Sequence, residues 1–216
     1  MPRYASFPPL VLSLMASQYS VAGEAQPQAI DPAFLPQACI FSAAFQQTQT
    51  LADIPKPLIS EGKLFFNCET GLIWQQQSPL AETHIYARTQ GVLRVANNNQ
   101  LQPRNEKLQK NLTKLLNGLM GGDTRYINRY FKTGRRSKSQ LELLPKRKAI
   151  AKFISRISIR KHPHSKEIFW ESPIGNTSLL KIYQLKSYRK FTKAQCREWL
   201  QLQQGEPSCQ VLNDEP

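Results

Sequence analysis

The chain has 216 residues, a length that normally forms one domain and can bury an apolar core. Its 29 Lys and Arg residues outnumber its 15 Asp and Glu residues, and the net charge of +14 favours polyanions or anionic lipid headgroups as partners. The sequence lacks the Gly-Xaa-Ser-Xaa-Gly elbow, the phosphate-binding loop and the His-Glu-Xaa-Xaa-His motif, which argues against the enzyme classes that these motifs mark.

The N-terminal residues have the pattern of a signal peptide. Arg3 supplies a positive region, residues 7–16 an apolar run, and Ser20-Val21-Ala22 a small-residue cleavage pattern. The apolar run is too short to span a bilayer. We therefore expect residues 1–22 to direct export, with a disordered tail as the alternative, and residues 23–38 to form a lead-in loop rich in Pro and Gln.

Five strands are predicted next by alternating apolar and polar residues, at 39–49, 58–68, 71–77, 82–89 and 92–97. If the first two form a hairpin, one register places Phe41 opposite Phe66 and Cys39 opposite Cys68. A Cys39–Cys68 disulfide leaves Cys196 to pair with Cys209; free or partly paired thiols are the alternative. Four cysteines fit an exported protein, because disulfides persist in oxidising compartments.

Bulky apolar residues gather on one face of this predicted hairpin and of the strand after it. Two interpretations fit: an ordinary core between sheet and helix, or a cavity for an acyl chain. An acyl chain needs only apolar lining, worth about 0.8 kcal/mol per buried methylene, so residue spacing does not separate the two. On the cavity interpretation, replacing Phe66 with Glu should abolish lipid binding and leave the fold cooperative. The predicted lining residues are Phe41, Phe45, Leu64, Phe66, Leu72 and Trp74.

The hydrophobic period changes after residue 100. Leucines recur at three- and four-residue spacing from Leu108 to Leu119, which predicts an amphipathic helix ended by Gly121-Gly122. Its apolar stripe must cover a surface, and the preceding sheet face is the obvious candidate. Asp123 is predicted to cap a second short helix through Tyr130. The residues expected on the underside of this lid are Leu112, Leu115, Leu116 and Leu119.

Alternation then resumes and predicts strands at 128–133, 139–144, 149–160, 166–172 and 177–186, followed by a helix over 192–202. The order of strands, helix and strands predicts an α+β fold that is mainly β. We expect a curled antiparallel sheet of about ten strands with helices packed on one side.

Basic residues are concentrated between Arg129 and Lys166, where Glu142 is the only acid. Nucleic acid is the usual partner of such a field, but an exported protein rarely meets it. An anionic membrane surface or an acidic partner is therefore favoured, and solvated strand faces without a partner are the alternative. The predicted docking residues are Arg135, Arg136 and Lys138. His162 and His164 have no third ligand nearby in the sequence, so no metal site or cofactor is predicted.

Five segments form a pattern along the chain: Phe41 to Gln46, Gly62-Lys63-Leu64-Phe65-Phe66, Leu72-Ile73-Trp74 with Pro79, residues 90–95 and Leu141 to Pro145. In their order and spacing they resemble the LolA-like family of periplasmic outer-membrane lipoprotein carriers. The resemblance extends over residues 39–185. The chain departs from the family at Cys68-Glu69, where the carriers have a basic residue that gates the lid. It also lacks their long helix before the first strand, and the Cys196–Cys209 region replaces their C-terminal strand.

The resemblance implies an incomplete β-barrel with an α-helical lid over a hydrophobic cavity, in one domain over residues 39–216. The implied function is to carry a lipid or lipoprotein acyl chain across the periplasm of a Gram-negative bacterium, from an inner-membrane donor protein to an outer-membrane acceptor protein. It implies no cofactor and no catalysis, and we expect a monomer. A non-catalytic interaction module, docking an anionic surface or partner through its basic strands, is the alternative function.

Overall fold

A computed structural model describes residues 30, 32–36, 38–96, 99–104, 107–202 and 206–213. Within these ranges the side chains of residues 32 and 104–113 are not described. The predicted signal peptide and the first part of the predicted lead-in loop lie outside the described residues. The rest of that lead-in contains a short 3-10 helix, η1 (Pro32–Phe34), and buries Phe34 and Leu35 in the core.

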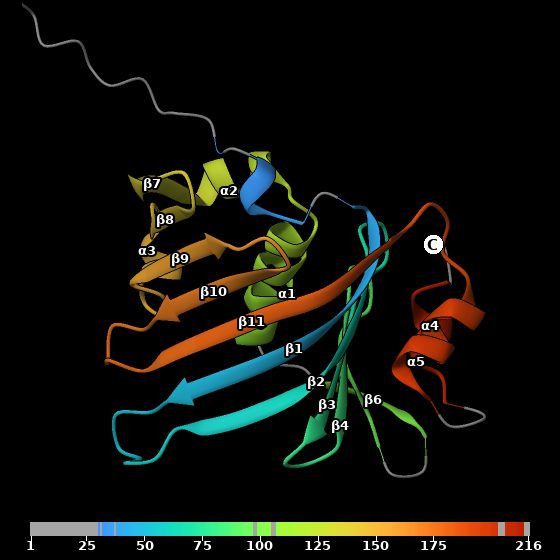
Figure 1. Ribbon diagram of the computed structural model, residues 1–216. Helices are drawn as coiled ribbons and strands as arrows, with labels where there is room; N and C mark the ends of the chain where they lie inside the picture. Colours follow the sequence, from blue (N-terminus) through green and yellow to red (C-terminus); the bar gives the residue numbers. More distant parts are fainter. Residues whose placement is uncertain are drawn as a thin grey trace, which may run out of the picture.

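The strands of the described chain form one antiparallel, eleven-stranded sheet in the order β6-β5-β4-β3-β2-β1-β11-β10-β9-β8-β7. The sheet curls but does not close, because β6 and β7 are its two edges (Figure 1). The predicted mainly β fold with an incomplete barrel is therefore confirmed. The strands are β1 (Ile40–Thr50), β2 (Leu58–Asn67), β3 (Gly71–Ser78), β4 (Glu82–Ala87), β5 (Gly91–Val95), β6 (Leu101–Arg104), β7 (Phe131–Arg136), β8 (Gln140–Pro145), β9 (Arg156–Lys161), β10 (Ser165–Glu171) and β11 (Thr177–Tyr188).

The predicted register of the first hairpin is confirmed. Phe41 pairs with Phe66 in the β1–β2 ladder, and a disulfide joins Cys39 and Cys68 just beyond it, with 4.8 Å between their Cα atoms. Phe45 lies opposite Gly62, where a Cβ atom would be 2.0 Å from the carbonyl oxygen of Gln75 on β3. Only glycine therefore allows β2 and β3 to approach this closely.

One predicted strand is wrong in its first half, and one strand was missed. The expected strand at 149–160 begins as helix α3 (Lys148–Ala151), and β9 starts only at Arg156. Its alternating apolar residues are instead held by helical hydrogen bonds, such as that from the Ile154 N–H to the Ile150 carbonyl. Strand β6 was not predicted, because it is short and contains Pro103, a residue that lacks an N–H and is tolerated at a sheet edge.

Helices cover both faces of the sheet, not one as predicted. Helix α1 (Lys107–Met120) lies inside the curl, whereas α4 (Lys193–Leu200) and α5 (Ser208–Val211) lie on the outer side (Figure 1). Strand side chains alternate between the faces, so Leu64 and Phe66 belong to the inner core and Phe65 to the outer one. This explains why the central strands are continuously apolar.

The outer core is closed by the second predicted disulfide, which is also confirmed. Cys196 on α4 and Cys209 on α5 are bonded and buried, with their Cα atoms 6.0 Å apart. They pack with Phe65, Ile73 and Ile85 from the sheet. This C-terminal unit is tied to the β2–β3 turn by a 2.8 Å hydrogen bond from the Thr70 hydroxyl to the Leu212 carbonyl.

The joint between α1 and α2 (Thr124–Tyr130) is specified by local chemistry. The Asp123 N–H donates to the Gly118 carbonyl and the Gly122 N–H to the Leu119 carbonyl, the two bonds of a Schellman motif. Gly122 adopts the left-handed conformation that this motif needs, with φ of 62°. As predicted, Asp123 then caps α2, since its side chain accepts from the Tyr126 N–H at 3.0 Å.

Replacing Gly122 with Ala should lower the free energy of unfolding by about 1–2 kcal/mol, because a side chain is strained at positive φ. The new Cβ atom would also lie 2.8 Å from the Pro36 carbonyl oxygen. Gly175 is the matched control, since its φ is also positive but no atom lies within 4 Å of the added Cβ. Urea denaturation should show a larger loss for Gly122→Ala than for Gly175→Ala; equal losses would mean that the contact with Pro36 does not matter.

Candidate functional site

The six residues predicted to line a cavity lie together on the concave side of the sheet. The rings of Phe41 and Phe66 are tilted against each other with their centroids 5.2 Å apart, and the centroids of the Phe45 and Trp74 rings are 4.0 Å apart. All six are buried, with exposed fractions of 9% or less. With Leu115 and Leu119 of α1 they belong to one packed core. None of the six lines the apolar cavity between α1 and β9–β11 that is described next, and their part in lipid binding stays a prediction.

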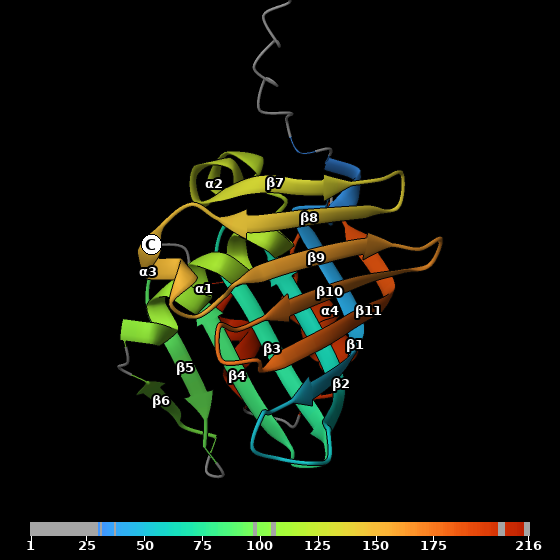
Figure 2. The same cartoon turned by 90° about the vertical axis from the view of Figure 1, so that its left-hand side faces the viewer.

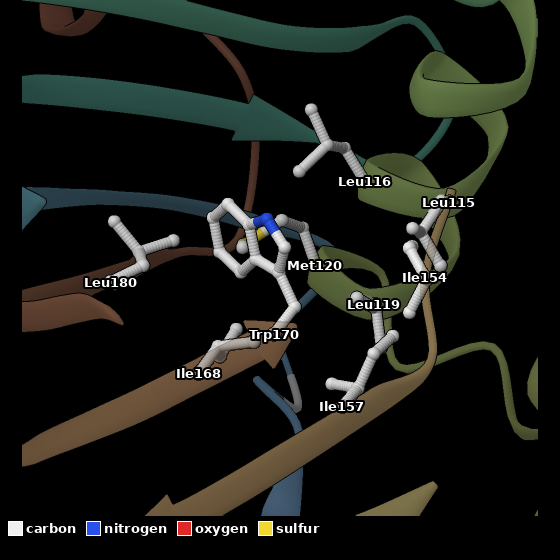
Figure 3. A pocket seen from close by; sticks show the side chains of 9 residues that line it. All are labelled: Leu115, Leu116, Leu119, Met120, Ile154, Ile157, Ile168, Trp170 and Leu180. Carbon is white, nitrogen blue, oxygen red and sulfur yellow. The ribbon is translucent and has the colours of Figure 1, made fainter. Parts of the chain in front are cut away.

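A small apolar cavity lies between α1 and strands β9–β11 (Figure 3). Its volume is about 40 Å³, well below the roughly 300 Å³ at which small-molecule pockets usually begin. Trp170 projects from β10 into the middle of the lining side chains, between Leu180 and the residues of α1 (Figure 3). The lining residues are Leu115, Leu116, Leu119, Met120, Ile154, Ile157, Ile168, Trp170 and Leu180.

Three of the predicted lid residues line this cavity. Leu115, Leu116 and Leu119 face it from α1, while the side chain of Leu112 lies outside the described residues. The opposite wall comes from the C-terminal strands and was not predicted. Its signal was present in the sequence, because Ile157 and Ile159, like Leu180 and Ile182, are two residues apart and so share a face.

Helix α1 has its most extensive described contacts along one side. It packs on β3, β4, β5 and α2, and the buried Asn117 donates from Nδ2 to the Tyr86 carbonyl at 3.3 Å. On its other side, Leu115, Leu119 and Met120 share a core cluster with residues of β9–β11, and the small cavity lies among them. A helix held at one wall of a curled sheet and facing a void at the other can widen that void by tilting away from it.

Tyr126 lies at the contact between α1 and α2. Its ring would be 2.5 Å from a Cβ atom at Gly118, so the helices meet closely, and its centroid is 4.6 Å from that of Tyr130. Burial, followed by the charges of Tyr130 and Asp123, raises the pKa of Tyr126 from 10.0 to about 12. The folded protein therefore holds the phenol proton more tightly than the unfolded chain does.

Stability should consequently depend on pH through this residue. Because the pKa of Tyr126 is higher in the folded protein, its contribution is complete below about pH 10 and is lost as the pH rises toward about 12. Urea denaturation at about pH 9 and about pH 11 should show a smaller alkaline loss for Tyr126→Phe than for the parent protein. Equal losses in both proteins would contradict this assignment.

The predicted docking residues lie at the β7–β8 turn. Arg135, Arg136 and Lys138 are all exposed there. Elsewhere in the basic region carboxylates pair with some of the cations: an Arg156 guanidinium nitrogen lies 2.7 Å from a Glu171 carboxylate oxygen, and one of Arg160 lies 3.6 Å from a Glu167 carboxylate oxygen. The role of Arg135, Arg136 and Lys138 in docking stays a prediction.

Neither a metal site nor a membrane-spanning helix is found among the described residues. No group of three or more His, Cys, Asp and Glu side chains among them is arranged to hold a metal ion. None of the described helices has the length and apolar composition that a bilayer crossing requires.

No family model matches the sequence, and no curated protein sequence matches it significantly. Among solved structures, the chain is similar to a LolA superfamily protein from Nitrosomonas europaea, with 11% identity, a TM-score of 0.45 and coverage of 76% of this chain and 92% of that one. It is also similar to a DUF1329 family protein from Desulfovibrio piger, with 10% identity, a TM-score of 0.32 and coverage of 73% and 89%.

A third similar structure, from Vibrio parahaemolyticus, is described as an outer-membrane lipoprotein-sorting protein domain. It has 9% identity, a TM-score of 0.33 and coverage of 77% of this chain and 92% of that one. All three TM-scores are below 0.5. The fold of this chain is therefore described by its own strand order and register.

Proposed function

We propose that this protein is a carrier that binds the acyl chain of a lipid or lipoprotein between α1 and strands β9–β11. The observation that carries the proposal is the cavity itself, which is apolar and is bounded on one side by a single amphipathic helix. An acyl chain needs no polar partner, and each methylene that it buries contributes about 0.8 kcal/mol. The protein then catalyses no reaction and needs no cofactor.

Loading requires α1 to move, because a cavity of about 40 Å³ is too small for an acyl chain. The helix would hinge on the edge where Asn117 and the Gly122 joint hold it, and Leu115, Leu116 and Leu119 would stay against the ligand. A partner that binds the open form better would shift the population toward it. We assign this role to a donor protein in the inner membrane and an acceptor in the outer membrane.

The periplasm of a Gram-negative bacterium is part of the proposal. The two disulfides are typical of an oxidising compartment, and residues 1–22 have the pattern of a signal peptide. Within this proposal the protein acts as a monomer, because a single chain encloses the cavity.

Native mass spectrometry of protein purified gently from the periplasm tests the proposal. We expect a bound mass of lipid size that is lost on denaturation and that lipid extraction of the same sample identifies. A bare polypeptide mass, combined with no uptake of added fatty acid or phospholipid, would refute it.

A second function is favoured by one observation: the six aromatic and aliphatic residues of the concave face are buried in one core cluster with Leu115 and Leu119 of α1. A module with a filled core would act through its surface, docking on an anionic membrane or partner through Arg135, Arg136 and Lys138. Reversing these three charges should abolish the docking of such a module and leave lipid binding by a carrier largely intact.

A further inference from the structure

Large apolar side chains are exposed mainly at one end of the sheet. Of the eight that the described residues expose, seven lie at or beside the loops that join β1 to β2, β3 to β4, β8 to β9 and β10 to β11. Leu185, at the other end of β11, is the exception. Five of the seven residues at the first end are referred to together as the apolar rim: Ile54, Leu58, Leu80, Phe153 and Ile174.

Hydrogen bonds join some of the loops that carry the apolar rim. The Ala52 N–H donates to the Asn176 side-chain oxygen at 2.9 Å, which joins the β1–β2 and β10–β11 loops. Both the N–H and the hydroxyl of Ser155 donate to the Glu171 carbonyl, at 2.7 and 2.9 Å, which joins the segment before β9 to the end of β10. The β1–β2 loop, the β10–β11 turn and α3 accordingly lie on one side of the molecule, on the left in Figure 1 and toward the viewer in Figure 2.

The rim residues are strongly exposed. Ile174 is 73% exposed and Phe153 is 47% exposed, and it is the grouping of such residues at one end of the sheet that marks an interaction surface. Exposed basic residues neighbour two of the rim residues in the sequence: Lys56 follows Ile54, and Arg147, Lys148 and Lys152 precede Phe153. Asp53 is the only acid in these loops, over residues 51–57, 79–81, 146–155 and 172–176.

Apolar tips among lysines match a bilayer surface better than a protein partner. Protein interfaces are depleted in lysine at their centre, whereas lysine and arginine beside a bilayer are attracted to anionic headgroups. Isolated apolar side chains on separate loops can each enter the boundary between headgroups and acyl chains. Charge and shape therefore point to the same partner, an anionic lipid bilayer.

The apolar rim is also next to the cavity. Ile154 and Trp170 line the cavity, and they directly adjoin Phe153 of the rim and Glu171, the residue bonded to Ser155. We propose that the apolar rim docks on an anionic membrane surface, so that the end of the cavity beside β9 and β10 faces the lipid. This rests on the proposed carrier function, and it assigns docking to the end of the sheet opposite Arg135, Arg136 and Lys138.

Co-sedimentation with phosphatidylethanolamine vesicles, made with and without phosphatidylglycerol, tests the proposal. The parent protein should bind the vesicles that contain phosphatidylglycerol. A Phe153→Ser, Ile174→Ser variant and a Lys148→Glu, Lys152→Glu variant should each bind them at least about tenfold more weakly, through lost insertion and lost attraction respectively.

Matched controls change the same residue types at the opposite end of the sheet. Leu185→Ser and an Arg135→Glu, Arg136→Glu variant should bind within about twofold of the parent protein, since the rim is untouched. All the substituted side chains are exposed, so thermal unfolding should stay cooperative, and this is measured first. Equal binding by the rim variants and the parent, a larger loss in the Arg135–Arg136 variant, or no binding by the parent would each overturn the proposal.

The lipid content of each protein, measured by native mass spectrometry, separates this proposal from the carrier function. Rim-dependent vesicle binding by a protein that never holds lipid would refute the carrier and leave the docking surface standing. Bound lipid in a protein whose vesicle binding is unchanged by the rim substitutions would support the carrier and refute the docking surface.

Discussion

Replacing Phe66 with Glu should unfold the protein. Phe66 is fully buried, beside Phe41 on one side and Gly121 on the other, where a Cβ atom on Gly121 would lie 3.3 Å from its ring. Losing a buried Phe side chain costs about 3–5 kcal/mol, and an unpaired buried carboxylate adds several more. The sum reaches the 5–15 kcal/mol that stabilises a typical domain.

The expected result differs from the sequence-based prediction that Phe66→Glu spares the fold. The measurement is urea denaturation followed by circular dichroism, which should show no cooperative transition for Phe66→Glu. Phe66→Leu is the control: it keeps the site apolar and should remain folded, with a loss of about 1–2 kcal/mol. A Phe66→Glu protein with an unchanged denaturation midpoint would show that the concave face is open to water.

The hairpin of β1 and β2 was predictable because its pattern has a period of two. A one-residue slip would turn Phe41 and Phe66 to the opposite face, so the apolar residues permit one register, and that register also sets Cys39 beside Cys68. The amphipathic helix and its glycine stop were predictable for a similar reason, since the spacing of leucines at three and four residues fits only a helix.

The coverage of the outer face was missed although a sign of it was present. Phe65 and Ile73 lie between inward-facing residues, and such continuous apolar runs mean that both faces of a strand are buried. The covering elements are α4 and α5, and their own pattern shows only that they are amphipathic. Which face of the sheet they reach depends on the path of the chain after β11, which no local pattern specifies.

The place of the cavity was beyond the reach of sequence reasoning. Core and cavity use the same residue types, and the side chains around the void of about 40 Å³ come from α1 and from residues 154–180, which no local pattern brings together. The prediction placed the ligand against the β1–β3 face, where Phe45 and Trp74 are in contact. The void instead lies against Ile157 and Trp170 on the other half of the sheet.

Replacing Leu116 with Glu should therefore weaken acyl-chain binding without unfolding the protein. Leu116 lines the cavity but is only half-buried, so a carboxylate there keeps contact with water until a ligand covers it. Covering it removes that hydration, which costs on the order of 2–4 kcal/mol and weakens binding at least about thirtyfold. Titration with a fluorescent fatty acid, alongside urea denaturation, measures both effects.

Two matched variants separate the apolar lining from other effects of the substitution. Leu116→Met keeps the cavity apolar and should bind within about threefold of the parent protein, because the two side chains have similar volumes. Lys114→Glu places a carboxylate on the exposed side of the same helix. It should bind the fatty acid as tightly as the parent protein does, because its carboxylate stays in water and outside the cavity. Unchanged affinity in Leu116→Glu would place the acyl chain elsewhere, whereas equal losses in Leu116→Glu and Lys114→Glu would trace the effect to long-range charge. Only a loss confined to Leu116→Glu makes the underside of α1 the surface that holds the ligand.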